Sequence, residues 1–392
     1  MSPAHAAPAS EASPEPASSF AQLTTMRVGG PAERVLVART AEELVQHAVA
    51  LWDAGEEWLL LGGGSNTVVC DEGLPVTVLL VRTTGIDRVD DPELPAGKVR
   101  LRVQAGQDWD ELVAACVERG WSGIEALSGI PGSAGAAPIQ NIGAYGAELS
   151  EVLHSIDFLD EGASEPQRVL AAELELTYRH SSIKAGRRGV VVSIDLVLEA
   201  NEDHSTPLSG PVRYAQLADE LGIVVGQRVS LRELRRAVLR LRASKGMVLD
   251  ASDHDTWSAG SFFTNPIVTE RFARELPPEA PRYTVDDVEA EAAVTTLEEL
   301  AAGVPLRLPQ PVSERRVKLS AAWLIEHAGI SRGFRLPGSH AAISSKHTLA
   351  ITNQGDATAD EVAQLARYVV QRVQAECGVI LVPEPNLYGL EL

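Results

Sequence analysis

The segment from Gly120 to Gly146 most constrains what this chain can fold into, because it holds seven glycines and one charged residue, Glu125. A packed helix or sheet does not need so many glycines, which weaken regular structure unless the backbone must approach something closely. A shorter run, Gly62-Gly63-Gly64-Ser65-Asn66, directly follows the apolar stretch at 58–61. An ordinary tight turn is the alternative for the shorter run, but two such loops favour a dinucleotide-sized cofactor held against bare peptide groups.

The glycine spacing argues against the most familiar dinucleotide-binding fold, the Rossmann fold. Neither loop reads G-x-G-x-x-G, and the intervals between Gly129, Gly132 and Gly135 do not fit the Rossmann turn. A plain NAD-type Rossmann enzyme is therefore disfavoured.

Length and net charge limit the number of domains and the kinds of binding partner. A chain of 392 residues predicts two or three domains, and a net charge of −20 disfavours nucleic acid as the main partner.

The three cysteines are far apart and form no C-x-x-C pair, which indicates neither a disulfide framework nor a thiolate metal site. Residues 1–18 lack the features of a secretory signal and are expected to be a disordered tail. The longest apolar runs, such as 76–81, are too short to cross a membrane.

The elements alternate between helices and strands along the chain. Thr40, Asp108 and Thr358, each with a glutamate three residues later, predict three capped helices that end before Gly55, Gly120 and Gly378. An apolar stripe predicts a further helix from about 231, inside an arginine-rich stretch (228–245) that we interpret as a solvated face. Strands are expected at 58–61, 76–81, 101–103, 174–178, 190–198 and 379–382. The class is α+β.

Five signatures, in order, resemble the UDP-N-acetylenolpyruvoylglucosamine reductase family, in its longer, type I-like subclass. They are Gly62–Asn66, Ile130–Gly146, Tyr178-Arg179, the run Gly260-Ser261-Phe262-Phe263-x-Asn265-Pro266, and Pro383-Glu384. The resemblance implies a cytoplasmic enzyme of peptidoglycan precursor synthesis. Such an enzyme uses FAD and NADPH to reduce UDP-N-acetylglucosamine enolpyruvate to UDP-N-acetylmuramate.

The resemblance also implies a domain plan. A two-lobed FAD-binding domain of the vanillyl-alcohol-oxidase (PCMH) type would comprise residues 19–84, completed by 378–392, and residues 85–245. A C-terminal α+β substrate-binding domain would span 246–377, with a proline- and acid-rich insertion near 275–311 that is longer than the family leads us to expect. No histidine lies between His47 and His154, so the FAD is expected to be non-covalent.

Three catalytic residues follow from the resemblance. It places Arg179 and Glu384 beside the developing enolate and makes Ser261 the proton donor to the substrate carbon. From the residues alone, Arg179 could be a surface ion pair, Ser261 a buried hydroxyl bonded to backbone, and Glu384 a solvent-facing acid between two prolines.

The same resemblance assigns binding residues. The cofactor set is Gly62, Gly63, Gly64, Ser65, Asn66, Pro131, Gly132, Ser133, Gly143, Ala144 and Tyr145. The substrate set, which would face the nucleotide-sugar diphosphate, is Tyr214, Lys245, Asn265 and Lys318, and each of these could instead be a surface residue or a core amide.

Two other functions remain open. One is a flavin oxidase of the same fold class that passes electrons to oxygen. The other is a catalytically inactive nucleotide-sugar or flavin-binding module. No metal site is expected, because His340 and His347 have no third ligand at suitable spacing. No membrane or obligate protein partner is indicated.

Overall fold

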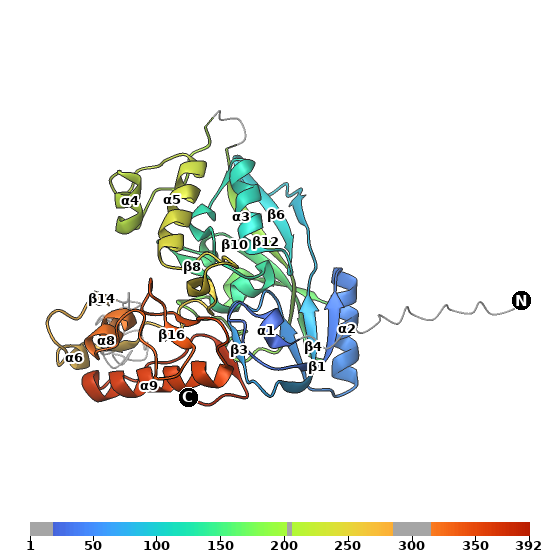
Figure 1. The fold of residues 1–392 in the computed structure, drawn as a ribbon. Coiled ribbons are helices and arrows are strands. Elements are labelled where there is room, and N and C mark those ends of the chain that lie inside the picture. The colour runs from blue at the N-terminus through green and yellow to red at the C-terminus, as the bar shows by residue number, and fades with distance from the viewer. Residues whose placement is uncertain (1–18, 202–205, 285–314) are drawn as a thin grey trace, which may run out of the picture.

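The computed structural model describes residues 19–201, 206–284 and 315–392. The predicted tail (1–18) and most of the predicted insertion (275–311) therefore lie outside the described residues. Figure 1 shows three parts: a blue part that carries helix α2 (Ala41–Asp53), a teal part built on a larger sheet, and an orange and red part with the long helix α9 (Ala359–Cys377) along its lower edge. We call them lobe 1, lobe 2 and the third unit. The predicted domain boundaries stay predictions.

Lobe 1 is built on a small parallel sheet with strand order β1-β4-β2. Thr40 accepts a hydrogen bond from the backbone N–H of Glu43 and begins α2, as predicted. The apolar stripe of this helix, Leu44, Ala48 and Leu51, is buried against strand residues of both lobes. The last strand of the chain pairs in parallel with β3 and so returns the C-terminus to lobe 1. The elements are α1 (Phe20–Leu23), β1 (Ala32–Ala38), α2 (Ala41–Asp53), β2 (Trp58–Leu61), β3 (Thr67–Val69), β4 (Leu74–Val81) and β18 (Asn386–Tyr388).

Lobe 2 is a mainly antiparallel six-stranded sheet of order β11-β10-β12-β6-β5, with β7 added beside β12. Helix α3 begins at its predicted cap, Asp108, and buries Trp109 and Leu112 in the core of this lobe. The strands are β5 (Ile86–Val89), β6 (Lys98–Gln104), β7 (Trp121–Ser122), β8 (Gly143–Ala144), β9 (Ala147–Glu148), β10 (Leu153–Asp160), β11 (Gln167–Leu170) and β12 (Gly189–Ala200). The helices are α3 (Trp109–Glu118) and the 3₁₀ turns η1 (Glu125–Leu127), η2 (Ala134–Gln140), η3 (Leu149–Glu151) and η4 (Ala171–Leu174).

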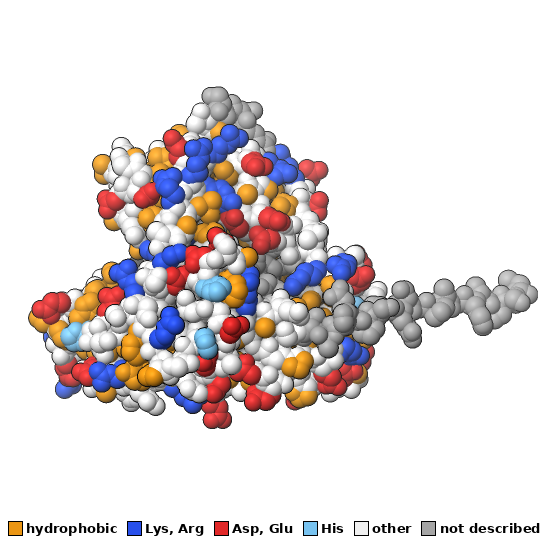
Figure 2. Space-filling model, viewed as in Figure 1, with side chains coloured by type: hydrophobic (Ala, Val, Ile, Leu, Met, Phe, Trp, Pro, Cys, Tyr) orange, Lys and Arg blue, Asp and Glu red, His pale blue; other side chains and the backbone are white. Residues whose placement is uncertain are grey.

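Two further helices, α4 (Ala215–Leu221) and α5 (Leu231–Ser244), project from lobe 2 with a small core of their own (Figure 1). On the face shown in Figure 2, Lys and Arg side chains gather over this upper part of the molecule. The strongly acidic chain thus keeps a locally basic region.

The third unit packs α8 and the long α9 against short strands. Thr358 and Glu361 form a complete capping box at the start of α9, and Gly378 ends the helix in the left-handed conformation. The elements are η5 (His254–Thr256), β13 (Ile267–Thr269), α6 (Glu270–Ala273), β14 (Arg282–Thr284), β15 (Arg316–Leu319), α8 (Ala321–His327), β16 (Ala341–Ile343), β17 (Ile351–Asn353) and α9 (Ala359–Cys377).

Two predicted strands are wrong. Residues 174–178 form the end of η4 and a turn, because Glu175 takes a left-handed φ of 51° that breaks extended structure. Residues 379–382 have no strand ladder, and the last strand is β18 instead. Arg179 therefore lies in a turn, and Glu384 precedes the final strand.

Candidate active site

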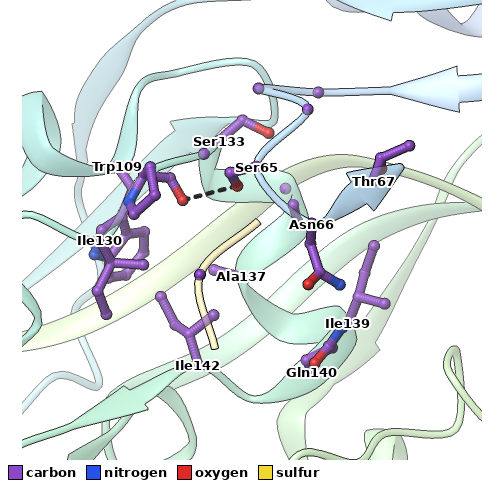
Figure 3. Close-up of a pocket in the computed structure, with 18 of the residues that line it drawn as sticks. Ser65, Asn66, Thr67, Trp109, Ile130, Ser133, Ala137, Ile139, Gln140 and Ile142 are labelled. Carbon is purple, nitrogen blue, oxygen red and sulfur yellow. Dashed lines mark hydrogen bonds between the residues drawn. The ribbon is translucent and has the colours of Figure 1, made fainter. Parts of the chain in front are cut away.

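A cavity of about 320 Å³ lies where the two glycine loops meet. The loop that follows β2 contributes Gly62–Thr67, and the loop before η2 contributes Ile130–Ser133. The hydroxyl of Ser65 donates a hydrogen bond of 3.0 Å to the carbonyl of Pro131, which fastens the loops together (Figure 3). The structure thus brings together the two segments that the sequence analysis singled out.

The loops approach so closely that a side chain at Gly63 would overlap the opposite backbone, because its Cβ would lie 2.8 Å from the Cα of Gly132. A Cβ on Gly62 would meet the hydroxyl of Ser133. Without side chains, peptide groups of both loops face the cavity, which suits a long ligand that carries phosphates.

Arg242 on α5 also lines this cavity, although its arginine-rich stretch was expected to be a solvated face. Burial lowers the pKa of its guanidinium. One terminal nitrogen donates to the carbonyl of Met247 at 2.8 Å, but Nε is buried with no hydrogen-bond partner among the described residues. Because this donor lines the cavity, it can bond an acceptor atom of a ligand there. The signal was present in the sequence, since Arg242 falls four residues after Val238 on the apolar stripe of α5.

Arg179 and Glu384 meet in the cavity wall. Nε of Arg179 lies 3.1 Å from a carboxylate oxygen of Glu384, and Nη2 donates to the carbonyl of Gly143 at 3.2 Å. Arg179 has a φ of 53°, in the left-handed region that non-glycine residues rarely adopt. Strain of this kind persists where neighbouring contacts enforce it, and it is frequent in active sites.

Ser261 reaches the same cavity because its segment pairs with the segment of Glu384. The N–H of Glu384 donates to the carbonyl of Phe262 at 2.9 Å, and the N–H of Thr264 donates to the carbonyl of Val382 at 3.1 Å. No described side chain or peptide group is hydrogen-bonded to the hydroxyl of Ser261. The hydroxyl is therefore available to a ligand.

The electrostatics of Glu384 reflect two opposing effects. Burial raises the pKa of this carboxyl, while the charges of Arg179 and Lys184 lower it, and the net shift is upward. The ammonium of Lys184 donates to the carbonyl of Arg179 at 3.1 Å, and burial lowers the pKa of Lys184. A carboxyl with a raised pKa in a cleft is a candidate for proton transfer or charge stabilisation.

The remaining predicted residues lie around this centre. Of the cofactor set, Ala144 and Tyr145 do not line the cavity, although Gly143 does. The ring of Tyr145 meets that of Tyr214 edge to face at 5.7 Å, and the ammonium of Lys245 lies 5.9 Å from the Tyr145 ring. This aromatic cluster is next to α4 and α5.

Lys318 and Asn265 lie on the third unit. The ammonium of Lys318 is 4.4 Å from the ring of Tyr178, the neighbour of Arg179. The side-chain oxygen of Asn265 accepts a hydrogen bond of 2.9 Å from the N–H of Ala321 at the start of α8. The site roles of these residues and of the aromatic cluster stay predictions.

Within the described ranges, no group of three or more His, Cys, Asp or Glu side chains could hold a metal ion. None of the helices in the described part of the chain combines the length and apolar character needed to span a bilayer.

The fold and the cavity define the class of protein, an FAD-binding protein of the two-lobed vanillyl-alcohol-oxidase type. A family model described as an FAD binding domain matches residues 32–165. A second model, described as the UDP-N-acetylenolpyruvoylglucosamine reductase C-terminal domain, matches residues 252–388.

Similarity to whole proteins identifies the family. The chain is 56% identical, over 94% of its length and 98% of the relative, to the UDP-N-acetylenolpyruvoylglucosamine reductase of Leifsonia xyli. It is 46% identical to that of Saccharopolyspora erythraea, over 97% of both chains. The chain belongs to the UDP-N-acetylenolpyruvoylglucosamine reductase family. A crystal structure of the reductase from Thermus caldophilus has the same fold, with a TM-score of 0.59 over 96% of this chain and 99% of that one at 24% identity.

Proposed function

We propose that this protein reduces UDP-N-acetylglucosamine enolpyruvate to UDP-N-acetylmuramate, with NADPH as hydride donor and non-covalent FAD as cofactor. The observation that carries the proposal is the convergence of Arg179, Ser261 and Glu384 on the cavity formed by the two glycine loops. The reaction belongs to peptidoglycan precursor synthesis. Its substrates are intracellular metabolites, so we expect the enzyme in the cytoplasm.

The residues present fit FAD. Bare peptide groups of Gly62–Asn66 and Pro131–Ser133 would hold its phosphates, and the unpaired Nε of Arg242 offers a donor to a polar edge of the ring system. When bound, FAD would carry the hydride between NADPH and the enolpyruvyl group, a transfer that no side chain can perform.

The chain's own residues would act on charge and protons. Addition of hydride to the vinyl carbon places negative charge on the carbon that bears the carboxylate, and Arg179, held by Glu384 and Gly143, is placed to stabilise it. Ser261 would then donate its proton to that carbon. An alcohol is a weak acid, so the step requires nearby positive charge, and the guanidinium groups of Arg179 and Arg242 line the same cavity.

The substrate's nucleotide diphosphate would lie outside this centre. Lys245 beside Tyr145 and Tyr214, and Lys318 beside Tyr178, present ammonium groups next to aromatic faces. Such pairs suit a pyrophosphate that carries a sugar and a base, because the rings stack on apolar or planar faces while the lysines neutralise charge.

The Ser261→Ala substitution tests the proposal. In an anaerobic stopped-flow experiment, bleaching of the flavin absorbance by NADPH should keep its wild-type rate, while recovery of the colour on adding the enolpyruvyl substrate should slow by roughly 10²–10⁴-fold. The matched control is Thr264→Ala, three residues along the same segment, whose hydroxyl bonds to the carbonyl of Val382 at 3.4 Å. The control should behave as wild type in both steps.

Unchanged recovery in Ser261→Ala would refute the role of the serine. A wild-type protein that recovers its colour only when oxygen is admitted would favour the oxidase alternative. A protein that NADPH never bleaches would favour a binding module.

A further inference from the structure

The turn that presents Arg179 is connected to the C-terminal end of η2 by hydrogen bonds. Thr177 and His180 close the turn with two backbone bonds of 3.3 and 3.2 Å. The hydroxyl of Ser181, which is fully buried, donates to the carbonyl of Ile139 at 2.7 Å. These contacts set the direction in which Arg179 leaves the backbone.

The side chain of Asn141 connects the Arg179 turn to neighbouring segments of lobe 2. Its side chain is 1% exposed, and its Nδ2 donates to the carbonyl of Thr177 at 3.1 Å and to a carboxylate oxygen of Glu148 at 2.9 Å. Its Oδ1 accepts the N–H of Ser150 at 3.0 Å. One amide thus joins the base of the Arg179 turn to β9 and η3.

The local backbone explains why asparagine suits this position. Asn141 ends η2 with a φ of 43°, a left-handed conformation that asparagine and glycine tolerate best. Aspartate would keep the acceptor but lose both donors, and it would face the carboxylate of Glu148. No other natural side chain combines the short reach, the two donors and the acceptor at this φ.

The hydrogen bonds of Asn141 also bear on the catalytic pair, Arg179 and Glu384. The carbonyl of Gly143, two residues after Asn141, accepts a hydrogen bond from the guanidinium of Arg179. Asn141 therefore fixes both the turn that carries Arg179 and the segment that carries this acceptor. We propose that Asn141 is a positioning residue that holds Arg179 against Glu384, an inference that rests on the proposed function. Without the amide, Arg179 leaves the geometry in which it stabilises the charge that follows hydride addition.

The test uses Asn141→Gly in the flavin-loaded enzyme, because glycine keeps the left-handed backbone while removing the amide. We expect oxidation of the bleached flavin by the enolpyruvyl substrate to slow about tenfold to a hundredfold, the range for a group displaced by about 1 Å. Bleaching by NADPH should change less than about twofold, because Arg179 acts only in the second step. Asn141→Asp should be at least as slow as Asn141→Gly.

A double-mutant cycle separates positioning from general damage. If Asn141 acts through Arg179, adding Asn141→Gly to Arg179→Ala should slow the second step by less than about twofold further. The matched control is Asn353→Ala, another buried amide, which donates to the carbonyls of Met26 and Arg27; none of these three residues lines the cavity. It should weaken folding without slowing the second step selectively.

Three outcomes would overturn the inference. They are an unaltered second step in Asn141→Gly, equal slowing of both steps, and full additivity with Arg179→Ala. Each requires that wild-type enzyme completes both steps and that Arg179→Ala slows the second. If the wild-type enzyme does not complete both steps, or if Arg179→Ala does not slow the second step, the proposed function is wrong. Failure of the proposed function can thus be told apart from failure of the inference about Asn141.

Discussion

Substituting Gly63 with alanine tests the contact between the two glycine loops by adding one carbon atom. The new Cβ would lie 2.8 Å from the Cα, 3.3 Å from the carbonyl carbon and 3.5 Å from the nitrogen of Gly132. Carbon atoms prefer a separation of about 3.5–4.0 Å, so the loops must move apart by roughly 0.7–1.2 Å. The Cβ of alanine is fixed by the backbone, and the atoms of Gly132 that it meets are backbone atoms, so a side-chain rotation cannot relieve the overlap.

The size of the effect follows from this overlap. Overpacking of this kind costs about 1–3 kcal/mol, which corresponds to a loss of roughly 5- to 150-fold in FAD affinity if the cofactor needs the loops in their present places. The φ of Gly63 is outside the left-handed region, so alanine adds no backbone strain, and the prediction concerns steric overlap alone.

The assay is a fluorescence titration of flavin-free protein with FAD, with thermal unfolding of the flavin-free protein measured in parallel. The matched control is Gly210→Ala, since a Cβ there meets no described atom within 4 Å and the residue also avoids the left-handed region. Wild-type FAD affinity in Gly63→Ala would refute the reasoning. So would an affinity loss of the same size in the control.

Two further predictions concern buried charge. The carboxylate of Asp195, 2% exposed, accepts hydrogen bonds from Arg100, Arg102 and Arg168, so Asp195→Asn should destabilise the protein by about 3 kcal/mol in chemical denaturation. The exposed pair Glu151–Arg213 provides the control, where Glu151→Gln should cost less than about 1 kcal/mol, and equal losses would contradict the argument. The raised pKa of Glu384 means that the folded state binds this proton more tightly than the unfolded state, so the carboxyl favours folding below its unfolded pKa and loses that contribution as pH rises through the folded pKa. The melting temperature of Glu384→Gln minus that of wild type should therefore increase from pH 4 to pH 8, and a difference that is equal at both pH values would count against the argument.

The parts of the fold that were predictable from sequence are those set by local chemistry. Helices α2, α3 and α9 begin at Thr40, Asp108 and Thr358, because each side chain accepts the N–H three residues later. These signals need no information about the rest of the chain.

The two wrong strands show where local pattern fails. Val379 and Leu381 are buried while Ile380 and Val382 are 60% and 59% exposed, so burial alternates along this segment as it does in a strand. A strand also needs a ladder of hydrogen bonds to a neighbouring strand. Here the neighbouring segment forms only one isolated bridge, between Phe263 and Pro383, just after residues 379–382. At 174–178 the alternation is interrupted by the left-handed Glu175, a conformation that a period-2 pattern does not encode.

The two glycine loops were predictable from the residues alone, but the catalytic residues were predictable only through family resemblance. Arg179, Ser261 and Glu384 come from distant segments, and nothing in their spacing indicates that they meet. Arg242 was missed for a different reason, because an arginine-rich helix is usually solvated and one member of the row turned out to face the cavity.

The position of Glu384 explains why the site depends on the whole chain. Its N–H donates to Phe262 of the third unit, while its carbonyl accepts hydrogen bonds from Asn66 of lobe 1 at 3.3 Å and from Gln140 of lobe 2 at 3.5 Å. Its side chain then pairs with Arg179 of lobe 2. One residue, Glu384, therefore joins all three parts at the place where the catalytic carboxyl is needed. Because these contacts both hold the parts together and set the direction of the carboxyl, a change in how the third unit packs must also change the geometry of Arg179 and Glu384.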